Sequence, residues 1–176
     1  TLEEARRQAK TGIGIWEWVG GKEASKNPDV VLASTGDYIT HEALMAVKWC
    51  REHVPELKVR YVNVSELTGI CLGDNCPHER KCPTKEHVEH YFTKDRPVVF
   101  AYHGYTNDVE QILWPYVHSE RFTLHGYREA GSTTTPFDMK VSNHLSCYNL
   151  AIDMIEKASL RNKKVAKKRS TLLRVL

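Results

Sequence analysis

The feature that most restricts the fold of this chain is the alternation of short apolar runs with longer stretches of helical periodicity. Four runs rich in apolar or β-branched residues lie at residues 30–34, 58–64, 97–102 and 121–126. Between these runs, apolar residues recur at helical spacing over 41–53, where Thr40 suits the N-cap of a helix, and a second helix is predicted over 107–118. This order predicts an α/β domain whose mostly parallel sheet is covered by helices on both faces. The pattern alone also allows a flavodoxin-like fold.

The composition fits one globular domain. A chain of 176 residues with 41% hydrophobic and 27% charged residues has room for a core and is ordinary for a protein in water. No apolar run approaches the ~20 residues that a membrane-spanning helix needs. The five cysteines lack the spacing of a secreted disulfide framework. We therefore expect a cytoplasmic protein with no membrane partner.

The two ends of the chain differ in character from its middle. Residues 1–11 predict a connector helix, and residues 12–160 hold the strand–helix pattern. Residues 161–176 form a basic C-terminal extension, with six Lys or Arg side chains by Arg169. Because the chain carries a net +3, subtracting these six charges leaves about −3 for the rest, which excludes a broadly basic nucleic-acid surface. We expect the extension to be a solvated helix or tail. The alternative is a contact with an acidic face or a polyanion.

The loops and the last helix are marked by local signals. Residues 20–28 and 65–96 are predicted to be loops, with a short helix at 87–92. Thr135 suits a helix N-cap, Pro136 the first turn and Asp138 the positive end of the helix dipole. One long helix is predicted to begin near Pro136. Its apolar stripe is expected to face a core or a partner subunit, and it consists of Val141, Leu145, Tyr148, Ile152 and Ile155.

Three motifs carry a resemblance to a known family. Residues 12–18 (GIGIWEW), 100–105 (FAYHGY) and 128–139 (REAGSTTTPFDM) together resemble the C-terminal domain of phosphoketolases. The resemblance extends from about residue 1 to residue 160. It implies a fold like that of the transketolase C-terminal domain, a small, mostly parallel mixed sheet of four to five strands with one antiparallel strand and helices on both faces.

The resemblance implies a function for a longer parent protein. Phosphoketolases are homodimers that cleave xylulose 5-phosphate or fructose 6-phosphate with inorganic phosphate, which gives acetyl phosphate and a shortened aldose phosphate. They bind thiamine diphosphate and magnesium between two upstream domains. The Gly-Asp-Gly metal motif is absent from this sequence, so we assign no catalytic, cofactor or metal residue to it. The chain alone is expected to be inactive, and to support the dimer and pack against the upstream domains.

The motif residues are therefore expected to be structural or to lie at interfaces. Aromatic surface around Trp16, Trp18 and Trp114 is expected to be exposed when the chain is alone. The expected positions are Trp16, Trp18, His103, Gly104, Tyr105, Gly131, Thr133, Thr134, Thr135, Pro136, Phe137 and Asp138.

One alternative is a regulatory module that binds a nucleotide or phosphate. Gly36 follows the first predicted strand, where doubly wound sheets bind ligands, and Gly131 precedes a helix start. The glycine spacing of a dinucleotide site is missing, so a plain turn is the favoured interpretation of Gly36. His103 also follows a strand, but no set of nucleophile, base and orienting residue accompanies it.

A less favoured alternative is a zinc-stabilised domain. Thiolate and imidazole groups are the ligands that zinc prefers. Structural sites, however, usually draw two separate ligand pairs together, whereas these residues form one compressed cluster. A polar loop with incidental cysteines is the favoured account. The zinc candidates are Cys71, Cys76, His78 and Cys82.

Overall fold

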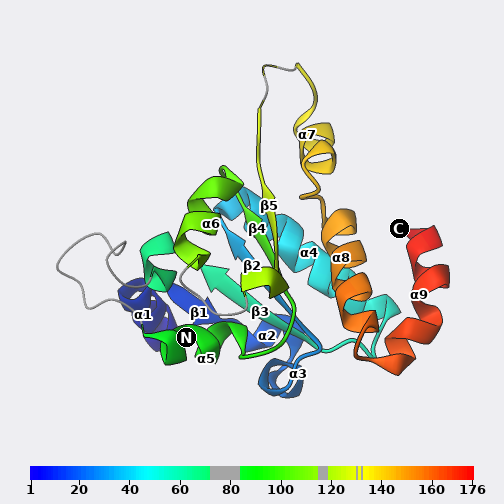
Figure 1. Cartoon of the computed structure of the whole chain (residues 1–176), viewed down its shortest axis with the longest axis horizontal. Helices are drawn as coiled ribbons and strands as arrows, with labels where there is room; N and C mark the ends of the chain where they lie inside the picture. Colours follow the sequence, from blue (N-terminus) through cyan, green and yellow to red (C-terminus); the bar gives the residue numbers. More distant parts are fainter. Residues whose placement is uncertain (72–83, 115–118, 130, 132) are drawn as a thin grey trace.

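The strands form one mixed sheet, as predicted. A computed structural model describes residues 1–71, 84–114, 119–129, 131 and 133–176. Within these residues the sheet has the order β1-β3-β2-β4-β5, and β1 is antiparallel to β3 while the other pairs are parallel (Figure 1). The strands are β1 (Ile13–Ile15), β2 (Val30–Thr35), β3 (Val59–Val64), β4 (Val98–Tyr102) and β5 (Phe122–Gly126).

Helices cover both faces of the sheet. On one face α4 and α8 pack against β2, and on the other α5 and α6 contribute Val88, Phe92, Val109 and Leu113 to a second core cluster. None of the described helices is long and apolar enough to cross a membrane. The described helices are α1 (Leu2–Thr11), α2 (Glu17–Gly20), α3 (Lys22–Lys26), α4 (Asp37–His53), α5 (Lys85–Phe92), α6 (Thr106–Leu113), α7 (Pro136–Ser142), α8 (Cys147–Ser159) and α9 (Lys163–Val175), with 3-10 turns η1 (Leu67–Ile70) and η3 (Ser119–Arg121).

The burial of the sheet on both faces explains why its strands could be recognised in the sequence. Successive side chains of a strand point to opposite faces, so a strand that is covered on both faces is apolar throughout. In β2, Leu32 enters the cluster under α4 and α8, and Val31 and Ala33 enter the cluster under α5 and α6. All three side chains are fully buried.

Three local predictions were wrong at their boundaries or in their type. Residues 20–28, predicted as a loop, contain the end of α2 and the whole of α3. Helix α4 begins at Asp37 and not at His41, because the turn at Gly36 (φ 95°) already lets the chain enter the helix. The hydroxyl of Thr40 lies 2.9 Å from that of Ser34 instead of capping the helix.

The last helical stretch is two helices, and the predicted single helix is wrong. Helix α7 ends at Ser142, His144 adopts a left-handed φ of 56°, and Ser146 caps the start of α8. The break shifts the helical phase, so Val141 and Tyr148 of the predicted stripe are 40% and 47% exposed. The side chains that α8 buries are Leu150, Ala151, Met154, Ile155 and Ala158.

The basic extension is a helix, but it is not wholly solvated. Helix α9 runs alongside α8 (Figure 1), and Val165 is fully buried between them and the core. Leu172 and Leu173 also pack against this core cluster. The cations face outward, where Lys168 pairs with Glu56. The apolar side of α9 therefore joins the core, while its charged side remains at the surface.

Candidate functional site

Three aromatic rings meet where the parallel strands end. His103 follows β4, Tyr127 follows β5, and Tyr38 lies in the first turn of α4 after β2. The ring centroids of His103 and Tyr127 are 4.9 Å apart at a right angle, and those of Tyr38 and His103 are 5.7 Å apart. The backbone N–H of His103 donates to the C=O of Thr35 at 3.1 Å. The strand ends therefore hold His103 between two tyrosines.

A buried ion pair lies beside these rings. The ammonium of Lys140 in α7 is 2.5 Å from Oε1 of Glu42 in α4, and it lies 4.6 Å from the ring centroid of Tyr38. The other oxygen of Glu42 accepts the N–H of Cys147 at the start of α8. Burial by itself would lower the pKa of Lys140, but the hydrogen bond and charge of Glu42 outweigh it and raise that pKa. Lys140 stays charged at neutral pH and ties α7 to α4.

Gly36 lies in close contact with His103. Its φ of 95° is open to glycine but not to other residues without strain. A Cβ added at Gly36 would lie 2.6 Å from the Cβ of His103. The structure thus brings together Gly36 and His103, two of the predicted candidates.

The third motif forms a projection. The described residues from Arg128 to Asp138, called the arm below, extend beyond the carboxyl ends of the strands and return through α7 (Figure 1). Asn143 fixes the base of the arm, since its side chain accepts from the N–H and donates to the C=O of Arg128, both at 3.0 Å. Nothing lies within 4 Å of the position of a Cβ added at Gly131. The arm has little packing against its own domain.

The predicted helix start within the arm is confirmed. The hydroxyl oxygen of Thr135 accepts the N–H of Asp138 at 3.1 Å, and Asp138 accepts that hydroxyl's proton at 2.6 Å. Pro136 occupies the first turn. The side chains of Thr133, Thr134 and the residues up to Asp138 are exposed, including Phe137.

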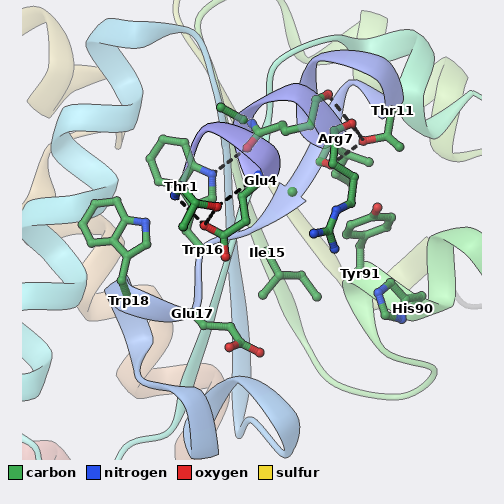
Figure 2. Close-up of a pocket in the computed structure, with 14 residues that line it drawn as sticks. Thr1, Glu4, Arg7, Thr11, Ile15, Trp16, Glu17, Trp18, His90 and Tyr91 are labelled. Atoms are coloured by element: carbon green, nitrogen blue, oxygen red, sulfur yellow. Dashed lines mark hydrogen bonds and ion pairs between the residues drawn. The ribbon is translucent and has the colours of Figure 1, made fainter.

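The first motif lies at the opposite edge of the sheet. The rings of Trp16 and Trp18 stack with centroids 5.4 Å apart. The indole N–H of Trp16 donates to Gln8 at 2.7 Å, and Gln8 donates to Asn63 at 2.6 Å, which joins α1 to β3. A groove of about 930 Å³ runs beside these rings, between α1, β1, α2 and α5 (Figure 2). We call it the β1 groove.

The cysteine cluster is only partly described. Cys71 is buried directly after η1, whereas Cys76, His78 and Cys82 lie outside the described residues. Among the residues that the structure describes, no three His, Cys, Asp or Glu side chains gather so that they could hold a metal ion. The zinc alternative therefore stays a prediction.

Sequence reasoning missed the groups that surround the motifs. Glu42 and Lys140 are 98 residues apart, and each lies in a helix where a charged residue usually indicates the solvent face. Tyr38 and Tyr127 follow strands without any motif of their own. The only available signal was their position after strands whose carboxyl ends share one edge of the sheet.

Comparison with known proteins gives the family. Residues 1–175 match the family model described as the XFP C-terminal domain. The chain is 40% identical over 157 residues to a probable phosphoketolase of Streptomyces coelicolor, and 41% identical over 158 residues to one of Clostridium acetobutylicum. Both alignments cover 89% of this chain but 19% of the relative, so the chain spans about a fifth of their length.

Solved structures of lower identity agree on the fold. A transketolase from Leishmania mexicana superposes with a TM-score of 0.55 at 14% identity, over 86% of this chain and 18% of that chain. A split-gene transketolase, described as an inactive β4 tetramer, gives a TM-score of 0.51 at 18% identity, over 76% of this chain and 40% of its own. Taken with the match to the family model and the relatives at about 40% identity, the chain belongs to the phosphoketolase C-terminal domain family.

Proposed function

We propose that this chain is the C-terminal part of a phosphoketolase. The whole protein cleaves xylulose 5-phosphate or fructose 6-phosphate with inorganic phosphate, and releases acetyl phosphate and an aldose phosphate. Support comes from relatives at about 40% identity that are named probable phosphoketolase. By likeness to that family, the parent is a cytoplasmic homodimer that uses thiamine diphosphate and Mg²⁺.

Within that enzyme, this domain takes no part in the chemistry. At the strand ends Lys140 is paired with Glu42, whereas the exposed His103 contacts the rings of Tyr38 and Tyr127. By likeness to the family, we place the thiamine diphosphate and the Mg²⁺ in the rest of the polypeptide.

The role of the domain is assembly. The observation that supports it is the exposed aromatic surface at its motifs and at Trp114. Trp18 and Trp114 are 68% and 83% exposed, as expected, while Trp16 is half-buried under Trp18. Tyr105 and Phe137 are exposed on the two motifs at the strand ends. Large aromatic side chains on a surface are typical of protein interfaces. The arm and these rings bind the upstream domains of the same polypeptide and support its dimer.

The arm can be tested in the full-length protein with one exposed residue. Phe137→Ser removes an exposed ring from the arm, and Leu160→Ser removes an even more exposed apolar side chain at the end of α8, outside the motifs. We expect Phe137→Ser to lower acetyl phosphate formation or dimer mass in sedimentation, with Leu160→Ser unchanged. If both variants keep wild-type activity and wild-type dimer mass, the arm is not part of the assembly surface.

A further inference from the structure

The β1 groove follows an unpaired sheet edge. Strand β1 is the last strand on its side of the sheet, and it pairs with β3 alone. The N–H of Trp16 donates to the C=O of Tyr61, and the C=O of Gly12 accepts from Ser65. Backbone groups alternate in direction along a strand, so those of Ile13 and Ile15 point away from β3 and toward the groove.

The backbone of Ile15 has no partner in the described part of the chain. The C=O of Ile13 accepts the hydroxyl of Thr11 at 2.8 Å, so that edge position is already used. Neither the N–H nor the C=O of Ile15 finds a partner among the described residues, although Ile15 lines the groove. An open edge position is a template for pairing with an extended segment.

The start of α1 directs the preceding chain toward this groove. Thr1 and Glu4 form a capping box, in which the hydroxyl oxygen of Thr1 accepts the N–H of Glu4 and the Glu4 carboxylate binds the backbone nitrogen of Thr1. In such a box the residue before the cap commonly packs against the fourth helical residue, which is Ala5 here. Thr1, Glu4 and Ala5 all line the groove, as do Trp16 and Trp18 (Figure 2).

The longer relatives supply an occupant. The matched stretch is about 19% of their length and is the C-terminal domain of the family, so polypeptide precedes it in those proteins. That polypeptide must join the domain at the mouth of the groove. The walls suit an extended segment with an apolar side chain, because the exposed indole of Trp18 and the half-buried Ile15 and Trp16 lie along them.

We propose that the extended segment directly before Thr1 in the full-length protein lies in the β1 groove. Its backbone pairs with the N–H and C=O of Ile15, and an apolar side chain near Ala5 covers the stacked rings of Trp16 and Trp18. The domain would then be seated on its own connector, which sets its orientation toward the upstream domains. This inference rests on the proposed place of the chain in a longer polypeptide.

Amide hydrogen exchange at single-residue resolution tests the proposal in the full-length protein. The wild type is compared with a variant in which the six or so residues before Thr1 are replaced by a Gly-Ser linker of equal length. We expect exchange at Ile15 to be at least about tenfold faster in the linker variant, the equivalent of one net hydrogen bond. The N–H of Trp16, which bonds to Tyr61, should stay protected in both proteins and reports that the domain is folded.

Two other outcomes overturn the proposal. If Ile15 exchanges fast in both proteins, the groove is empty. If Ile15 is protected in both, a second copy or another domain covers it. Should the linker variant lose protection at Trp16, Trp18→Ala replaces it, with Leu160→Ala as the control because both side chains are exposed and Leu160 lies outside the motifs. Only Trp18→Ala should then speed exchange at Ile15, and equal exchange in the two variants refutes the proposal. The exchange experiment does not measure acetyl phosphate formation, so its result is independent of the assembly test at Phe137.

Discussion

Replacing Lys140 by methionine removes the cation of the buried pair and keeps most of the side-chain volume. Lys140 and Glu42 are 9% and 7% exposed, so the carboxylate that remains has little access to water. Loss of one partner from a buried pair costs roughly 3–5 kcal/mol, because the other charge is left uncompensated. The contact of the ammonium with the ring of Tyr38 adds to that loss. We expect a decrease of this size in the free energy of unfolding, measured by urea denaturation of residues 1–176.

Two variants separate burial from charge. Lys168→Met breaks a pair with Glu56 that has the same 2.5 Å separation but lies at the surface, and its effect should be too small to distinguish from wild type. The double variant Lys140→Met/Glu42→Gln leaves no buried charge, so it should recover most of the stability. The reasoning is refuted if Lys140→Met is no more destabilising than Lys168→Met.

The pH dependence of this effect follows from the raised pKa of Lys140. A lysine whose pKa is higher in the folded chain than the ordinary 10.5 contributes its full stabilisation below that value. The contribution is lost only as the pH rises through the folded pKa. Lys140→Met leaves a carboxylate that can take up a proton, so the comparison uses Lys140→Met/Glu42→Gln, in which neither position can titrate. The difference in the free energy of unfolding between wild type and this double variant should not fall between about pH 6 and pH 9.

Three further predictions concern single residues. Gly36→Ala should cost roughly 1–3 kcal/mol in thermal unfolding, because it combines a φ of 95° with a collision against His103, and a neutral result would contradict that packing. Burial raises the pKa of the Cys50 thiol to about 12, so native protein at mildly alkaline pH should resist alkylation at this residue until urea is added, as peptide mapping can show. Val165→Ala should lower the free energy of unfolding by about 1.5–3 kcal/mol, because the side chain is fully buried. Lys167→Ala, on the exposed side of α9, should change it by less than about 0.5 kcal/mol. Equal effects of the two variants in urea denaturation would mean that α9 is not part of the core.

The sheet was largely predictable because of how it is buried. Strands that are covered on both faces carry almost continuous apolar runs, and β2 and β4 could be recognised from such runs without knowledge of their neighbours. In β3 the β-branched and aromatic residues gave the signal, although Arg60 and Asn63 interrupt the apolar run. Strand β1 has only three residues, Ile13 to Ile15, which is too short for a periodic signal. Its existence becomes clear only from its pairing with β3, a contact between segments about 50 residues apart.

The candidate site was less predictable than the fold. The helix start at Thr135 depends on neighbouring residues and was predicted correctly. The break at His144 depends on how α7 and α8 pack, and periodicity continued through it without a signal. The Lys140–Glu42 pair joins helices that are far apart in the sequence, so local sequence patterns cannot predict it. Side chains that meet only in the folded domain lie beyond what spacing can indicate.

The most direct test of the assembly account is a reconstitution. Acetyl phosphate formation from xylulose 5-phosphate is measured for the upstream part of the full-length protein, for this chain alone, and for the two mixed. Each reaction contains phosphate, thiamine diphosphate and magnesium. The account predicts no product from this chain alone and a clear rise in activity on mixing. Product formed by this chain alone, or full activity of the upstream part without it, would contradict the claim that the domain acts by assembly.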